Sequence, residues 1–167
     1  MTEPPRYLPA RSFPGYAYLP GKSHHPTQHP EGHSFGHVID ACYLPAARWR
    51  DNDDYLYGVD LYNHGYFWEA HEAWEGLWQI AGHDAAQASF LQGLIQCTAA
   101  ALKIAMEQPR GLERLSAAGT GRLEGVARGG APEYMGLDVM SFVLEFRAFA
   151  ASDPQSADER PLLELDV

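Results

Sequence analysis

The sequence has little of what several classes of protein require. Its 167 residues include only two cysteines, Cys42 and Cys97, whose separation fits neither a metal clip nor a disulfide framework. No stretch of about 18 residues is apolar and free of charge, so we expect no membrane span. Basic residues are scarce as well, because 12 Lys and Arg stand against 22 Asp and Glu, for a formal net charge of −10. We therefore expect nucleic acid to be repelled and not bound.

The motifs of familiar enzyme classes are also missing. The sequence contains no Gly-x-Ser-x-Gly elbow, no phosphate-binding loop and no Gly-x-Gly-x-x-Gly. The first ten residues are polar and proline-rich and lack the basic and apolar regions of a secretory signal, which favours a cytoplasmic location. The composition leaves three partners open, namely a small molecule, another protein or a second copy of this chain.

The positions of proline and glycine, and the stretches in which apolar residues recur at helical spacing, divide the chain into three regions. Residues 1–37 contain seven prolines, which disfavour helix, together with aromatic residues that a solvated tail rarely carries. We expect them to form an extended arm that packs on the body. Residues 38–151 predict an all-α bundle of about five helices that begins with a helical hairpin, and no strand pattern competes. Residues 152–167 are acidic and are expected to be loose.

Capping residues and helix breakers set the expected ends of the helices. Asn52 or Asp51 is a candidate N-cap, and Gly65 is a candidate left-handed C-cap. The third helix is apolar on nearly every side, which predicts a central position, and its Gly93 and Cys97 would allow another helix to approach closely. After a short helix or irregular lead-in over 38–50, the predicted helices span residues 51–62, 66–80, 84–107, 110–128 and 134–151.

The most informative stretch is the second predicted helix. His71 and Glu75 are four residues apart on it, so their side chains can bind the same ion or each other. Imidazole and carboxylate ligands suit zinc, iron or manganese, and the neighbouring Glu72 is a candidate general base. The string is not the zinc-protease motif, which requires a second histidine where this chain has Glu75. Three interpretations stay open: a structural hydrogen-bonded pair, metal ligation, and acid–base catalysis without metal.

Other side chains extend this polar side of the helix. Trp68 and Trp78 flank it, which is unusual for a solvated face, whereas Glu69 lies off both the polar and the apolar side. On the third helix, Gln92 and Gln96 are one turn apart on a single stripe. Buried amides need partners, so this stripe either faces the carboxylates of the second helix or lies in solvent.

The arm carries five of the eight histidines in the chain, at positions 24, 25, 29, 33 and 37. A histidine-rich tract suggests metal binding. The spacing is irregular and no cysteine assists, so we favour non-specific binding or none. One member, His33, could reach the polar side of the second helix from a turn in the arm.

Two blocks of the sequence carry a family resemblance. The first is Asn63-x-Gly65-x-Phe67-x-Glu69-Ala70-His71-Glu72-x-Trp74-Glu75-x-x-Trp78. The second is Phe90-x-Gln92-Gly93-Leu94-Ile95-Gln96. In this order and at this separation, the blocks resemble the hallmark of the DUF309 family of small bacterial, archaeal and plastid helical proteins. The resemblance covers roughly residues 48–146.

The resemblance implies an all-α bundle in which the hallmark polar residues gather between two helices. Trp68 departs from the pattern, because many relatives have a smaller or acidic residue there, and this reshapes the implied site. The family implies no particular reaction. The site candidates carried over from it are Glu69, His71, Glu72, Glu75, Gln92 and Gln96.

Two functions of different classes remain open. In the first, a pocket between the second and third helices binds a divalent metal or a small ligand and supports hydrolysis, with His71 and Glu75 as metal ligands and Glu72 as the catalytic group. In the second, the protein is a non-enzymatic helical adaptor or structural protein, and the same residues form a buried hydrogen-bond network. The ligand-binding candidates in the first hypothesis are Glu69, Gln92, Gln96, Trp68, Trp78 and Asn63.

Overall fold

The computed structural model describes residues 3–38, 40–130 and 132–166, and the predictions made for residues 1–2, 39, 131 and 167 lie outside it. Its architecture is all-α, as predicted, with one very small antiparallel strand pair. In chain order, the elements are a 3-10 helix (Ala46–Asp51), α1 (Asp53–Asn63), α2 (Phe67–Ile80), α3 (Ala85–Ala105), α4 (Pro109–Gly129), β1 (Glu133–Tyr134), β2 (Leu137–Asp138) and α5 (Val139–Ala151).

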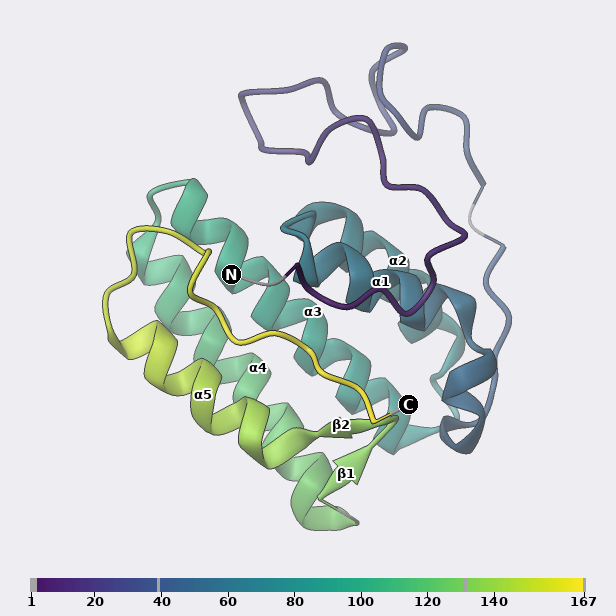
Figure 1. The fold of residues 1–167 in the computed structure, drawn as a ribbon, viewed down its shortest axis with the longest axis vertical. Helices are drawn as coiled ribbons and strands as arrows, with labels where there is room; N and C mark the ends of the chain where they lie inside the picture. Colours follow the sequence, from purple (N-terminus) through teal and green to yellow (C-terminus); the bar gives the residue numbers. More distant parts are fainter. Residues whose placement is uncertain (1–2, 39, 131, 167) are drawn as a thin grey trace.

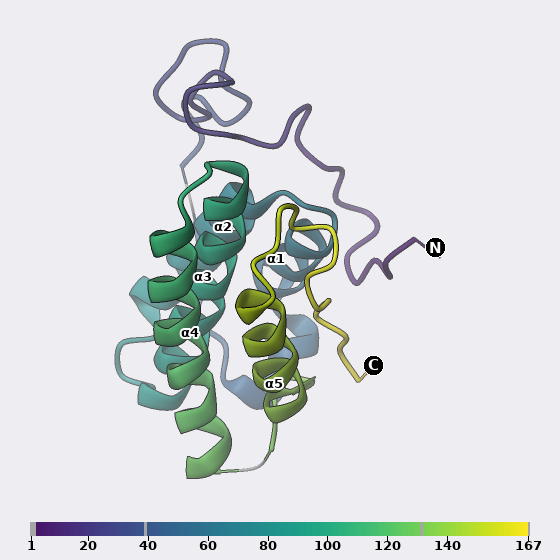
Figure 2. The ribbon, with the colours of Figure 1, turned by 90° about the vertical axis from the view of Figure 1, so that its left-hand side faces the viewer.

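Helices that follow one another in the chain also pack against one another. α1 packs on α2, α2 on α3, α3 on α4, and α4 on α5, so that α3 lies in the middle of the bundle (Figures 1 and 2). Short connections between the helices explain this order, since a turn of a few residues places the next helix beside the previous one. The prediction that the third helix is central is confirmed.

Local signals set the ends of these helices. The side chain of Asn52 accepts a hydrogen bond from the backbone N–H of Tyr55 and so caps α1, while Asp84 caps α3 through the N–H of Gln87. Gly65 has a φ of +85°, the left-handed conformation expected for the residue that ends α1. Pro109 occupies the first turn of α4. Backbone N–H groups in a first turn have no acceptor within the helix, so proline loses no hydrogen bond there.

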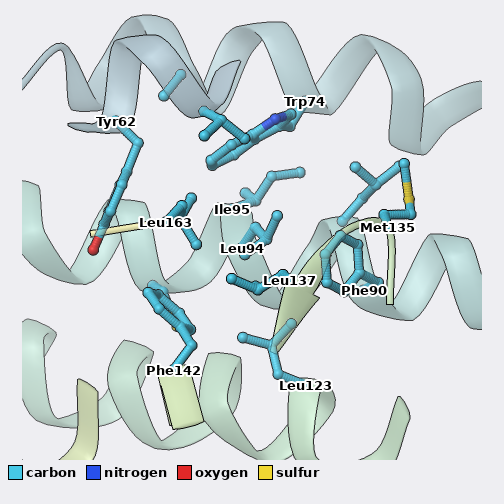
Figure 3. Packing of buried hydrophobic residues seen from close by; sticks show 14 of the residues in the cluster. Tyr62, Trp74, Phe90, Leu94, Ile95, Leu123, Met135, Leu137, Phe142 and Leu163 are labelled. Carbon is cyan, nitrogen blue, oxygen red and sulfur yellow. The ribbon is translucent and has the colours of Figure 1, made fainter. Parts of the chain in front are cut away.

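The core is built around α3. Its Phe90, Leu91 and Leu94 are almost fully buried between the neighbouring helices (Figure 3). By length and composition alone, α3 is long and apolar enough to cross a membrane. A helix at the centre of a bundle has the same composition, and α3 packs between α2 and α4. The packing against α4 is close, because a Cβ at Gly119 would lie 2.8 Å from Cys97 Sγ. The predicted close approach at the small residues of α3 is therefore confirmed.

The fifth helix begins later than predicted. Residues 133–138 form a tight β-hairpin, and α5 starts only at Val139, so the expectation that the body contains no strand was wrong. The backbone explains the difference, because Met135 and Gly136 have φ values of +49° and +79°, which no right-handed helix accommodates. Asp138 then caps α5 by accepting a hydrogen bond from the N–H of Ser141.

The C-terminal segment is packed, which corrects the prediction that residues 152–167 are loose. It runs back along α5 towards β2 (Figure 1), and Leu163 is 1% exposed among Tyr62, Phe142 and Leu94 (Figure 3). Asn63 Nδ2 donates to Leu163 O at 2.9 Å, and Leu163 N donates to Asn63 Oδ1 at 2.8 Å. The acidic composition was misleading because buried leucines and these backbone bonds decide where the segment lies.

The N-terminal arm passes across α1 and α2 and then forms loops beyond them (Figures 1 and 2). Its first anchor is Asp60 of α1, whose side chain is fully buried. Asp60 Oδ1 accepts from Tyr7 N at 2.7 Å, and Oδ2 accepts from Leu8 N at 3.0 Å and from Arg6 Nε at 2.9 Å. A carboxylate removed from water needs such donors, so these three bonds hold the start of the arm on the helical body.

Candidate functional site

The polar cluster predicted on the second helix is present on α2. His71 Nε2 lies 3.5 Å from Glu75 Oε2, and His71 Nδ1 lies 3.5 Å from Glu72 Oε1. The three side chains are between 30% and 37% exposed. One donor atom from each residue falls within 4.8 Å of the others, which is close enough for a shared metal ion.

The two nitrogens of His71 have different neighbours. Nε2 faces Glu75, whereas Nδ1 faces Glu72 on the other side of the ring. An ion between Nε2 and Glu75 would leave the N–H on Nδ1 directed at Glu72. Metal-bound histidines commonly donate their second N–H to a carboxylate in this way, which holds the ring in place. The geometry of α2 would therefore leave His71 and Glu75 as two candidate ligands and Glu72 as a third, supporting carboxylate.

Burial raises the pKa of the Glu72 carboxyl above its ordinary value. The nearby His71 opposes this rise, and the negative charge of Glu75 adds to it. A carboxyl group with a raised pKa exchanges protons more readily near neutral pH than a fully solvated one. Glu72 is thus a candidate for proton transfer.

A pocket of about 600 Å³ opens beside the cluster, between the arm and the first two helices. Glu72 belongs to its wall as well as to the α2 cluster. A smaller pocket of about 350 Å³ between α5 and the C-terminal segment contains none of the predicted site residues. The larger pocket is lined by Arg11, Ser12, Phe13, Pro14, Thr27, His33, Ser34, His37, Val38 and Asp40 from the arm and the segment after it, and by Asp54, Tyr57, Leu61, Trp68, Glu69, Glu72 and Ala73 from the helices.

Glu69 forms part of this wall and binds the arm. Its side chain is 5% exposed, and Oε1 accepts hydrogen bonds from His33 Nε2 at 2.9 Å and from Tyr18 N at 2.8 Å. Its second oxygen, Oε2, is buried without a partner in the described part of the chain. The helical pattern had placed Glu69 off both faces, and only the histidine-rich turn of the arm pointed to a partner for it.

The two tryptophans that flank the cluster differ in their surroundings. Trp68 lines the pocket and contacts the arm, with its ring roughly perpendicular to those of Tyr18 and His25 at 5.2 and 5.5 Å between centroids. Trp78 is 37% exposed and is not part of the pocket wall. Trp68 therefore shapes the pocket and also holds the arm over it.

The remaining candidates lie elsewhere. Gln92 and Gln96 are half-buried on α3, do not line this pocket, and make no side-chain hydrogen bond within the described ranges. The amide of Asn63 is already engaged by Leu163, as described above. The pocket therefore lies between α1, α2 and the arm, whereas the sequence had suggested a pocket between α2 and α3.

A second group of metal-binding residue types lies on the arm. His24, His29 and Glu31 bring donor atoms within 4.8 Å of one another, and the Glu31 side chain is 74% exposed. The backbone N–H of Glu31 donates to His29 Nδ1 at 3.1 Å, which occupies one ring nitrogen of that histidine. This group is more solvated than the α2 cluster, and none of its three residues lines the 600 Å³ pocket.

Fold and site together define a small helical-bundle protein with a histidine–carboxylate cluster at the rim of a covered pocket. Residues 55–115 match the DUF309 family model, described as a domain of unknown function. The resemblance to the DUF309 family is thereby confirmed over these residues. No curated protein and no solved structure matches the chain. The matched residues include all of α2 and α3, whereas the arm that closes the pocket lies outside them.

Proposed function

We propose that His71 and Glu75 bind a divalent metal ion at the rim of the pocket, and that Glu72 transfers protons during hydrolysis of a substrate held inside it. One observation supports this proposal: Glu72 Oε1 lies 3.5 Å from Nδ1 of the proposed ligand His71, and Glu72 also lines the pocket. A substrate in the pocket would therefore lie next to the acid–base group, and the proposed ion would lie on the Nε2 side of the neighbouring His71. A pocket of this size suits a small molecule.

The distance between the two proposed ligand atoms agrees with metal binding. Bonds of about 2.0–2.2 Å to an imidazole nitrogen and a carboxylate oxygen place those atoms roughly 3–3.5 Å apart at tetrahedral or octahedral angles. His71 Nε2 and Glu75 Oε2 lie 3.5 Å apart. A bound ion would make its water acidic enough to attack an ester, amide or phosphate bond.

The chain's own residues supply the rest of the chemistry. Glu72 lies beside Nδ1 of His71 and would orient the ring through that nitrogen, while its position in the pocket wall brings it within reach of a bound substrate. Glu69 and Trp68 hold the arm over the opening, which limits access of bulk water.

Metal titration of untagged, chelator-treated protein tests the proposal. Calorimetry with zinc, manganese and iron(II) should show one ion per chain, accompanied by a higher melting temperature. His71→Ala and Glu75→Gln should abolish this binding, whereas Glu113→Gln on the exposed surface of α4 should not. A molar ratio near zero for the unaltered protein, with no gain in melting temperature, would refute the metal site.

A second candidate function has its own support in the contacts of Glu69. Because this buried carboxylate bonds two groups of the arm, the α2 residues could serve as a structural network in a non-enzymatic adaptor. The His71→Ala and Glu75→Gln double variant separates the two functions. A large fall in the melting temperature of the metal-free protein favours the structural network, and unchanged stability with lost metal binding favours the site.

A further inference from the structure

The electrostatic character of the pocket indicates what it binds. We infer that the pocket accepts a small ligand with a protonated amine, whose cationic group is received by Glu69 and Glu72. The inference rests on the pocket of the proposed function, and not on the metal ion at its rim. It names the class of substrate that the pocket would select.

Negative charge prevails on the pocket wall. Four carboxylates line it, from Asp40, Asp54, Glu69 and Glu72, against a single guanidinium, that of Arg11. This guanidinium is already engaged, because Arg11 Nη1 lies 2.9 Å from Asp54 Oδ1 and the group stacks 3.9 Å above the ring of Tyr57. An anionic ligand would therefore meet no available arginine or lysine there, whereas a cation would meet several carboxylates.

Glu69 provides an independent observation. The side chain is 5% exposed and lines the pocket, and its Oε2 has no hydrogen-bond partner within the described ranges. Burying a carboxylate oxygen without a donor is unfavourable. The neighbouring Oε1 is already bonded to Tyr18 N and His33 Nε2, so Oε2 is the oxygen of this carboxylate that still lacks a donor. A protonated amine supplies such a donor together with the charge that balances the carboxylate.

The aromatic part of the wall favours the same kind of ligand. Two of its rings already make cation–π contacts with arginines. The guanidinium of Arg6 lies 3.9 Å from the centroid of the Phe13 ring, and that of Arg11 lies 3.9 Å from the centroid of the Tyr57 ring. Trp68 is the third ring, beside Glu69 and Glu72 on α2, and tryptophan is the strongest cation–π acceptor. An ammonium group near Glu69 would thus have carboxylates and the ring of Trp68 in the same pocket wall.

The test compares amines with neutral molecules of the same shape. Benzylamine and 1,4-diaminobutane are titrated into the full chain by calorimetry in the presence of EDTA, next to benzyl alcohol and 1,4-butanediol. The amines should bind about tenfold or more tightly than the alcohols, since hydrogen bonds to charged groups are stronger than neutral ones. Equal affinity for amine and alcohol, or no amine binding up to about 10 mM, would overturn the inference.

Variants locate the binding. Glu69→Gln and Glu72→Gln should each weaken benzylamine binding about tenfold, while Glu113→Gln leaves it unchanged. Glu69→Gln could also loosen the arm, which tryptic cleavage after the exposed Lys22 would reveal. Glu72 makes no hydrogen bond to the described residues of the arm, so Glu72→Gln removes its charge while its pairing with His71 is the contact that changes. If both variants bind benzylamine as the unaltered chain does, the inference is wrong.

The two proposals fail independently. Amine binding in EDTA that persists in His71→Ala would support the amine pocket even if no metal binds. Metal binding without amine selectivity would leave the metal site intact and overturn the ligand class.

Discussion

His33 Nε2 in the arm lies 2.9 Å from Glu69 Oε1 on α2, although the two residues are 36 positions apart in the chain. Both side chains are at most 10% exposed, so this contact is one of the places where the arm enters the body of the protein. It joins a residue inside the region that matches the DUF309 model to one outside that region. The pocket therefore depends on a segment that the family match does not include.

The first prediction concerns the anchor of the arm at Asp60. Asp60→Asn replaces one acceptor oxygen with a donor, which leaves either Tyr7 N or both Leu8 N and Arg6 Nε without an acceptor. It should lower the free energy of unfolding by about 1–3 kcal/mol. Trypsin should then cut faster after Arg11. Asp53→Asn, an exposed neighbour on α1, is the control and should leave the cleavage rate unchanged. Equal rates in all three proteins would show that Asp60 does not hold the arm.

The second prediction concerns the contact between α3 and α4. Gly119→Ala places a Cβ 2.8 Å from both Cys97 Sγ and Gly93 O, and it should destabilise the protein by about 1–3 kcal/mol. Gly121→Ala is a matched control in the same helix, because nothing lies within 4 Å of its Cβ. It should raise stability by up to about 1 kcal/mol through helix propensity. Chemical denaturation measures both, and a stabilising Gly119→Ala would contradict the close packing.

The third prediction tests the packed C-terminal segment. Leu163→Ala removes a side chain that is 1% exposed and should lower the free energy of unfolding by about 2–5 kcal/mol. Leu162→Ala, at the half-buried preceding position, should change it by about 1 kcal/mol or less. Thermal and urea unfolding give both values. Similar effects at the two positions would mean that the segment is not held in this register.

The fourth prediction concerns pH and the cap of α5. Hydrogen bonds from Ser141 hold the pKa of Asp138 below its ordinary value, so its carboxylate stabilises the folded protein above that value. This stabilisation disappears as pH falls below about 3.9 and through the lowered pKa of the folded state. Asp138→Ala should therefore cost about 1 kcal/mol at pH 7 and progressively less in acid.

Asp138→Asn is the control for this pH dependence. It keeps a capping oxygen without a titrating charge, so the difference in stability between the Asn and Ala variants should stay constant from pH 7 to pH 3. A gap between the unaltered protein and Asp138→Ala that does not narrow in acid would rule out the carboxylate as the source.

Features encoded within a few residues could be predicted from the sequence. The all-α class, the caps at Asn52 and Gly65, and the central position of α3 follow from helical spacing, capping side chains and helix breakers. The grouping of His71, Glu72 and Glu75 follows in the same way, because residues three or four apart on a helix are neighbours wherever the helix packs. These properties depend on backbone geometry alone.

Contacts between distant residues were decided only by the tertiary structure. Asn63 bonds Leu163 across 100 positions, and Glu69 bonds His33 across 36, and neither spacing carries a periodic signal. The acidic C-terminal segment is packed because its leucines are buried against the folded body. The pocket lies under the arm because buried carboxylates of α1 and α2 accept hydrogen bonds from the arm. The sequence by itself thus determined the cluster on α2, whereas the folded chain decided which cavity that cluster borders.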